Sequence, residues 1–133
     1  MESSALVAAL LEHDTTAMEP LPAGTRLVTS ALTLAETARA IIRARVAERL
    51  TAEQEQAAIR ALHTFRRRCF VLDVDGRVLS RVGRRFPVEP IRTLDALHLA
   101  TAELLDESPQ LVTIVTRDAR VRENALALGH VVT

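Results

Sequence analysis

The fold is decided by the stretch Ile91-Arg92-Thr93-Leu94-Asp95-Ala96-Leu97-His98-Leu99-Ala100-Thr101-Ala102. We predict a helix here, running to about residue 105 and capped by Thr93, because Pro87 and Pro90 keep the preceding residues extended. Leucine and alanine surround the helix with apolar atoms, so we expect it to be largely buried. Its first turn carries Asp95, and a buried carboxylate requires a cation, a metal ion or several hydrogen-bond donors. The alternative is that Asp95 only complements the positive N-terminus of the helix.

Length and composition predict one folded domain over residues 1–133. The chain is 48% apolar and has a formal net charge of zero, so no overall field attracts it to nucleic acid or to a membrane surface. Its only cysteine, Cys69, excludes an internal disulfide and argues against a cysteine zinc site. The apolar run over residues 5–11 is too short to span a bilayer, and we expect a cytoplasmic protein.

Outward from the central helix, predicted strands alternate with predicted helices. We predict strands at residues 27–30, 69–72, 111–115 and 131–132, and helices at residues 5–12, 33–50, 51–65, 76–86 and 119–128, with a loop at 13–24. Ser4 is assigned mainly to capping the first helix, Thr51 and Gln54 match a capping box, and Gly129 closes the last helix. The strand segments are continuously apolar, which is typical of a parallel sheet covered on both faces. The fold class is therefore α/β, a three-layer α/β/α sandwich with a short parallel sheet. Such sheets bind ligands at the carboxyl ends of their strands.

Four acids are expected near that edge: Glu2 before the first helix, Glu36 and Asp95 each in the first turn of a helix, and Asp118 after a strand. Each also has a structural interpretation. Glu36 completes a possible capping box with Thr33, and Asp118 is a possible N-cap. Four acids around one crevice are harder to explain in this way, because clustered carboxylates repel one another unless a cation neutralises them. Oxygen ligands suit Mg²⁺ or Mn²⁺ and not zinc, and such ions catalyse in-line hydrolysis of phosphodiesters.

These residues carry a family resemblance. The chain resembles the PIN-domain ribonucleases of the VapC toxin type in segments 2–7, 30–36, 93–102 and 115–118, of which Thr93 to Ala102 is the most specific. The resemblance implies a PIN-like fold, an endoribonuclease site dependent on Mg²⁺ or Mn²⁺, and inhibition by a cognate VapB-like antitoxin. It assigns Glu2, Glu36, Asp95 and Asp118 as metal ligands and the last three as the catalytic residues. The family has aspartate where this chain has Glu2, and we expect its first strand to be absent here.

Other polar residues receive a structural interpretation. His98 is one turn after Asp95, and we place it outside the catalytic set because a histidine in a buried helix is more often a hydrogen-bonded core residue. The stripe of Arg77, Arg81 and Arg84 is predicted to contact RNA phosphates, although a charged face is usually only solvated. The chain has four glycines and contains neither a dinucleotide fingerprint nor a P-loop.

Two functions from different classes remain open. The first is a metal-dependent endoribonuclease toxin that acts as a homodimer, with an antitoxin peptide laid along the helical hairpin of residues 33–65. The second is a catalytically weak or inactive PIN-fold module for binding or dimerisation. Glu36, Asp95 and Asp118 favour the first. The expected absence of the first strand and Glu2 favour the second, because we expect a glutamate beside a terminus to be loosely held and a poor ligand.

Overall fold

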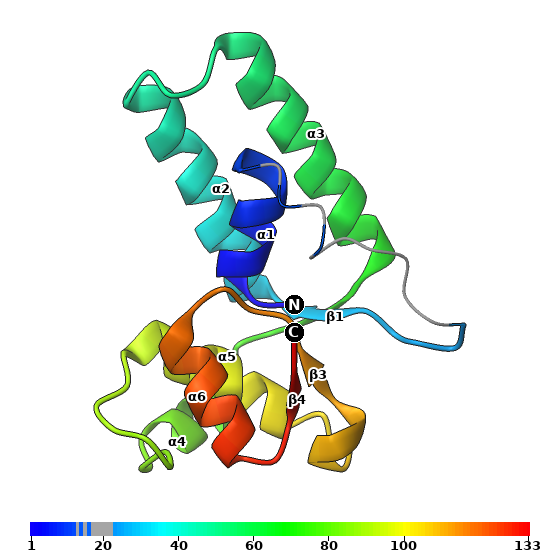
Figure 1. Ribbon diagram of the computed structural model, residues 1–133, viewed down its shortest axis with the longest axis vertical. Coiled ribbons are helices and arrows are strands. Elements are labelled where there is room, and N and C mark those ends of the chain that lie inside the picture. Colours follow the sequence, from blue (N-terminus) through cyan, green and yellow to red (C-terminus); the bar gives the residue numbers. More distant parts are fainter. Residues whose placement is uncertain (13, 15, 17–22) are drawn as a thin grey trace.

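The computed structural model describes residues 1–12, 14, 16 and 23–133 of the chain. It is organised as two helical halves that meet at short strands (Figure 1). The hairpin half contains helices α1 (Ser3–Leu11), α2 (Ala31–Val46) and α3 (Ala52–Arg68), and the C-terminal half contains α4 (Gly76–Val82), α5 (Thr93–Glu103) and α6 (Ala119–Ala127). The predicted α/β class with short parallel strands is confirmed.

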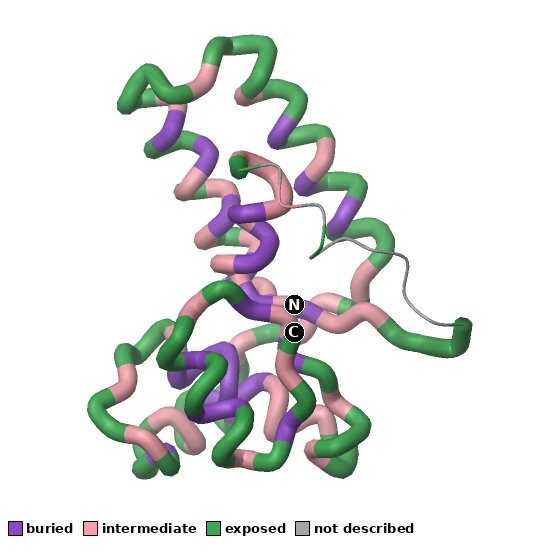
Figure 2. The backbone as a smooth tube through the Cα atoms, viewed as in Figure 1, coloured by how far each residue is buried: buried purple, intermediate pink, exposed green. Residues whose placement is uncertain are grey.

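Helices α2 and α3 form the long antiparallel hairpin, with α1 packed against it (Figure 1). The predicted capping box at the start of α3 is present, since the Thr51 hydroxyl accepts from the backbone N–H of Gln54 and the Gln54 side chain accepts in return. The apolar face of the hairpin closes over a core of Leu6, Ile41, Ala58, Leu62 and Phe65. The tip of the hairpin is exposed (Figure 2).

The C-terminal half has its own core, built around α5. The buried residues of α5 pack with apolar residues of α4, α6 and strand β3, and this core comprises Val78, Phe86, Ala96, Leu97, Leu99, Ala100, Ile114, Val121 and Ala125. Six consecutive residues of α5, from Ala96 to Thr101, are buried, which confirms the expectation for the middle of this helix. Leu94, in its first turn, is 46% exposed, so the expectation fails at the N-terminal end.

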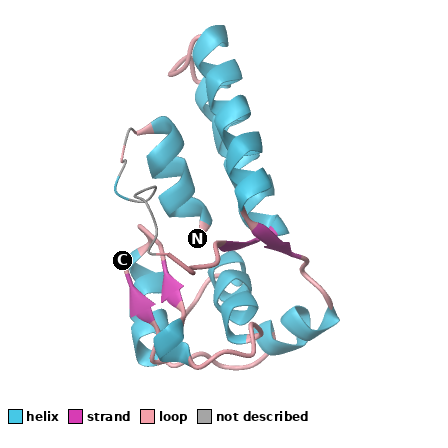
Figure 3. Ribbon diagram, turned by 90° about the vertical axis from the view of Figure 1, so that its right-hand side faces the viewer, coloured by secondary structure: helices cyan, strands magenta, loops and turns pink. Residues whose placement is uncertain are grey.

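The strands form two parallel pairs. Strand β1 (Val28–Ser30) pairs with β2 (Phe70–Leu72), and β3 (Thr113–Ile114) pairs with β4 (Val131–Val132). The N-terminal residues lie between the pairs (Figure 3). Met1 N donates to the Val28 carbonyl at 3.1 Å and Glu2 N to the Val115 carbonyl at 3.0 Å, so the N-terminal dipeptide connects the two pairs.

Several element boundaries differ from the sequence predictions, since α2 ends at Val46 and not near residue 50, and α4 ends at Val82 and not near residue 86. Helix α2 begins at Ala31, because Ser30, whose hydroxyl accepts from the Thr33 N–H, is the N-cap in place of Thr33. Thr93 is the first residue of α5 and not its cap, and Arg92 at the cap makes no side-chain hydrogen bond to the helix. The predicted strand at 111–115 is shortened because residues Pro109–Leu111 form a 3₁₀ helix, η2. Most of the predicted loop at 13–24 lies outside the described residues.

Two terminal predictions agree with the structure. Asp118 caps α6, and Gly129 follows that helix with φ at +88°, the left-handed conformation that glycine adopts without strain. No helix within the described ranges is long and apolar enough to cross a membrane.

Candidate active site

The Glu2 carboxylate is buried at the start of α1, where its side chain is the helix cap. The hydroxyls of Ser3 and Thr116 donate to it at 2.6 and 2.7 Å, and Ser4 donates from both its hydroxyl and its backbone N–H. The expectation of a loosely held Glu2 is therefore wrong. Its main chain is fixed by Val115 and its carboxylate by four donors, which compensate for its burial.

These hydrogen bonds set the ionisation of Glu2. Burial acts to raise the pKa of its carboxyl, but the bonds from Ser3, Ser4 and Thr116 outweigh that effect and lower the pKa below its ordinary value of 4.5. A carboxylate that accepts several hydrogen bonds is stabilised in its charged form. Glu2 therefore places a fixed negative charge in the interior at neutral pH.

Asp118 lies between the end of β3 and the start of α6. Its Oδ1 accepts from the backbone N–H groups of Arg120 and Val121 at 2.8 and 3.1 Å, and its own N–H donates to the Thr116 hydroxyl at 3.0 Å. Thr116 therefore connects Glu2 and Asp118 through one hydroxyl, as acceptor from Asp118 and donor to Glu2. The structural interpretation of Asp118 as an N-cap is correct, and it uses only one of the two carboxylate oxygens.

Asp95 differs from the other acids because part of its carboxylate has no partner. Its Oδ2 is buried and makes no hydrogen bond to any residue that the structure describes. Burial and, after it, the negative charges of Asp118 and Glu2 raise the pKa of Asp95, against weaker opposition from Arg92 and His98. An unsatisfied buried acceptor costs free energy, and it is the group that a bound cation would satisfy.

Glu36 is connected to this cluster through His98. The imidazole Nε2 of His98 lies 2.7 Å from Glu36 Oε2 and 3.7 Å from Glu2 Oε1. Because α2 begins at Ala31, Glu36 is in the second turn of its helix and not in the first. The structure thus brings Glu2, Asp95 and Asp118 within electrostatic reach of one another and joins Glu36 to them by a histidine.

One oxygen of the acidic cluster is suited to a hard divalent cation. Within residues 1–12, 14, 16 and 23–133, no three or more His, Cys, Asp and Glu side chains are grouped so that they could hold a metal ion. Mg²⁺, however, binds through one or two carboxylates and completes its shell with water and substrate phosphate. Asp95 Oδ2, which has no hydrogen-bond partner among the described residues, fits that mode of binding, while Glu2 and Glu36 accept from hydroxyls and from imidazole.

The arginine stripe predicted to face RNA is mostly engaged within the protein. Arg77 pairs with Asp75 at 3.3 Å. Arg81 pairs with Glu103 at 2.8 Å, and its guanidinium lies 3.9 Å from the centre of the Phe86 ring. Of the three predicted residues, only Arg84 makes no ion pair with another described residue.

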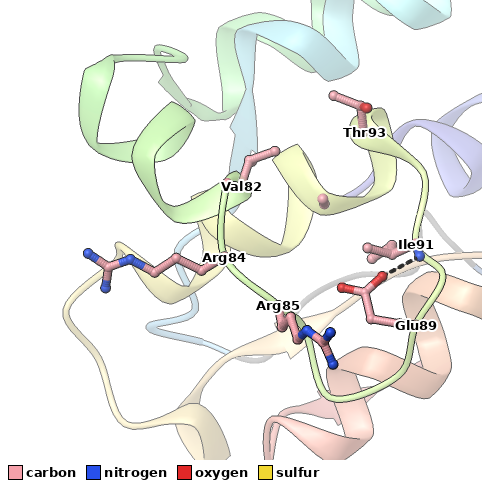
Figure 4. A pocket seen from close by; sticks show the side chains of 8 residues that line it. Val82, Arg84, Arg85, Glu89, Ile91 and Thr93 are labelled. Atoms are coloured by element: carbon pink, nitrogen blue, oxygen red, sulfur yellow. Dashed lines mark hydrogen bonds between the residues drawn. The ribbon is translucent and has the colours of Figure 1, made fainter.

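Arg84 and its neighbour Arg85 line a shallow pocket of about 280 Å³ at the N-terminal end of α5 (Figure 4). Both are exposed, and the ends of their side chains extend in different directions. Glu89, on the pocket wall, is satisfied by the backbone N–H groups of Phe86 and Ile91. The pocket wall therefore carries two arginines near the helix of Asp95, with the Arg84 guanidinium extending away from the other lining residues (Figure 4).

Sequence reasoning missed three residues of the network. Ser4 was assigned mainly to helix capping, Thr116 was not singled out, and His98 was placed in the core. Thr116 lies two residues before Asp118, and that spacing is a local signal that could have identified it. His98 had no local signal, since its partner Glu36 is 62 residues away.

Comparison with known proteins identifies the family. The PIN domain family matches residues 1–126. Ribonuclease VapC46 of Mycobacterium tuberculosis (strain ATCC 25618 / H37Rv) is 37% identical over 105 residues, which are 79% of this chain and 71% of that protein. Ribonuclease VapC35 of Mycobacterium tuberculosis (strain CDC 1551 / Oshkosh) is 36% identical over 104 residues, 78% of this chain and 69% of that protein.

Proposed function

This chain belongs to the PIN domain family, and from that premise we propose that it is a metal-dependent endoribonuclease toxin of the VapC type. The observation that carries the proposal is the buried Oδ2 of Asp95, which has no hydrogen-bond partner among the described residues and lies beside the negative charges of Asp118 and Glu2. The competing proposal, a weak or inactive PIN-fold binding module, rests in part on a loosely held Glu2. That part loses its support because Glu2 accepts from four donors.

Asp95, Asp118 and Glu36 are the ligands that we propose for Mg²⁺ or Mn²⁺, with Glu2 completing the acidic site. When bound, the cation supplies charge neutralisation at the phosphodiester and a more acidic water for in-line attack. Ser4 and Thr116 hold the Glu2 carboxylate in one orientation. We assign catalysis to Glu36, Asp95 and Asp118.

RNA is bound, in this proposal, by Arg84 and Arg85. Both are exposed and lie beside the helix of Asp95, so their guanidinium groups are available to phosphates on either side of the scissile bond. Phosphate contacts orient a substrate without reading its sequence. This replaces the face of Arg77, Arg81 and Arg84 predicted from sequence, since Arg77 and Arg81 are paired with acids.

An antitoxin peptide is proposed to bind the hairpin half. A cavity of about 320 Å³ between α1, α2 and the turn after α2 has apolar walls from Val7, Leu11 and Leu50, and its charged lining residues are Arg43, Arg49 and Glu12. This combination suits a segment that inserts an apolar side chain and places a carboxylate against the arginines. Isothermal titration with a candidate VapB-like peptide tests this, and Arg43→Glu is expected to abolish binding by like-charge repulsion.

Metal-dependent cleavage is the direct test of the proposed function. We expect the purified chain to cut single-stranded RNA with Mn²⁺ or Mg²⁺ present and to stop when EDTA is added. Asp95→Asn purified in parallel controls for contaminating ribonuclease. Cleavage that continues in EDTA, or that is equal in the variant, contradicts the proposal.

The homodimer and the cytoplasmic location stay predictions. Light scattering of the eluted protein gives the mass, and a mass near 14.6 kDa at all concentrations contradicts the dimer.

A further inference from the structure

We propose that His98 is a positioning residue of the acidic site, whose imidazole holds the Glu36 carboxylate in the orientation needed for metal binding. The inference rests on the function proposed above, because it concerns the same site. It assigns a role to a residue that the sequence alone places in the core.

The geometry joins the two halves of the molecule. His98 lies on α5, one turn after Asp95, and Glu36 lies on α2. The His98 side chain is only 6% exposed, yet its Nε2 reaches Glu36 Oε2 at 2.7 Å. The second carboxylate, that of Glu2, lies 3.7 Å from the same nitrogen. A single imidazole nitrogen therefore lies between two acids from different helices.

The contact with Glu36 requires a proton on Nε2, because an ionised carboxylate only accepts. In the neutral ring with that proton, Nδ1 accepts, and the Thr33 hydroxyl lies 3.5 Å from it. Thr33 is in turn 3.2 Å from the hydroxyl of Ser30, the residue that caps α2. These contacts therefore run from Ser30, the N-cap of α2, through Thr33 and His98 to Glu36 in the second turn of the same helix.

A core histidine without this role does not account for the short bond. Such a residue is satisfied by a backbone carbonyl, whereas the closest partner of His98 is an acid that is itself partly exposed. A glutamate on a helix surface has several rotamers, and freezing them costs conformational entropy. The hydrogen bond to His98 restricts the Glu36 side chain to one rotamer before a metal ion binds. Residues that orient metal ligands usually act in this way.

The first experiment measures Mn²⁺ affinity of the whole chain by isothermal titration. We expect His98→Ala to weaken binding by about 10- to 100-fold, the usual effect of losing such an orienting group. His98→Gln is expected to restore much of the affinity, because its amide nitrogen lies at the ε position. His98→Asn is expected not to, because its amide stops one bond short. His63→Ala, an exposed histidine on α3, is the matched control and leaves affinity unchanged.

The second experiment asks whether His98 acts through Glu36. In a Glu36→Gln background, we expect His98→Ala to cause little further loss of Mn²⁺ affinity. The same fold loss in both backgrounds shows an action independent of Glu36 and overturns the inference. No effect of Glu36→Gln alone instead rejects Glu36 as a ligand, which is a failure of the proposed function.

A third measurement does not depend on any variant folding. Long-range ¹H–¹⁵N spectra of the metal-free protein report which ring nitrogen of His98 carries the proton. We expect Nε2–H with Nδ1 bare. A ring protonated only at Nδ1 cannot donate to Glu36 and overturns the inference.

Discussion

The two halves of the molecule supply two acids each to the site, and they hold them differently. In the hairpin half, Glu2 accepts from three hydroxyls and an N–H, and Glu36 accepts from an imidazole. In the C-terminal half, Asp118 uses one oxygen to cap α6, and Asp95 has a buried oxygen without a partner among the described residues. The acids of the hairpin half therefore have hydrogen-bond partners, among them Thr116 and His98 of the C-terminal half, whereas the acids of the C-terminal half keep oxygens without a partner among the described residues.

This difference suggests a division of work within the acidic site. A carboxylate with both oxygens hydrogen-bonded, such as that of Glu2, contributes charge and shape, whereas one with an oxygen left over contributes a bond to a metal ion. The shorter side chains of aspartate, both from the C-terminal half, suit direct ligation because fewer rotors are frozen. The predictions below change one side of this comparison at a time.

The largest effect is expected for Asp95→Asn. A bound cation contributes several kcal/mol to transition-state stabilisation, so we expect RNA cleavage to fall by about 1,000-fold. Asp73→Asn, an exposed aspartate, is the control and keeps full activity. A variant that still cleaves at the parental rate contradicts the assignment.

Without metal, the same Asp95→Asn substitution is expected to make the folded protein more stable. Because burial and then Asp118 raise the pKa of Asp95, ionising it costs folding free energy. The stability of the metal-free protein therefore falls as pH rises from 3.8, the ordinary pKa of aspartate, through the raised pKa of Asp95. The variant does not lose this stability, because asparagine does not ionise. Thermal unfolding at pH 7 without metal is expected to show a higher Tm for Asp95→Asn, and added Mn²⁺ stabilises only the parent.

The next effect concerns the cores of the two halves. Phe65→Ala empties a buried site in the hairpin half and is expected to lower the unfolding free energy by about 3–4 kcal/mol. Leu99→Ala in the C-terminal half is expected to cost about 2–5 kcal/mol. If the halves unfold together, each variant shifts one urea transition. Two separate transitions would show that the site joins independently stable units.

A smaller effect is expected for Thr116→Val, which removes a buried donor to Glu2 and costs about 1.5–3 kcal/mol. Since the hydrogen bonds lower the pKa of Glu2, they stabilise the fold above pH 4.5, and that stability is lost as pH falls through the lowered pKa. The variant is therefore expected to lose less stability on acidification than the parent. Thr113→Val, exposed on β3, is the control. Identical acid unfolding of Thr116→Val and parent would show that this bond does not set the pKa.

The smallest effect is expected from replacing both Arg84 and Arg85 with Gln, measured as RNA binding by the inactive Asp95→Asn protein. Two phosphate contacts on a single strand contribute about 1.4 to the slope of log affinity against log salt, which the double variant loses. Arg77→Gln is expected to leave the slope unchanged, because Arg77 already pairs with Asp75. The reverse result would return the RNA face to the stripe predicted from sequence.

The sequence alone determined the features that depend on near neighbours along the chain. The apolar run around Asp95 predicted a buried helix, the Thr51 and Gln54 spacing predicted a capping box, and Asp118 with Gly129 predicted the two ends of α6. Each involves residues within a few positions of one another, where helix geometry leaves few choices. The types of the four acids were likewise readable, and so was their chemistry toward a hard cation.

Only the tertiary structure decided which of these acids are satisfied and which are free. The donors to Glu2 include Thr116, 114 residues away, and the partner of Glu36 is His98, 62 residues away. The pairing of Arg81 with Glu103, which withdraws it from the RNA face, also requires α4 to pack against α5. Such contacts depend on how the two helical halves pack against each other. No local sequence pattern predicts that packing, because the free energy that stabilises it is spread over the residues of both cores.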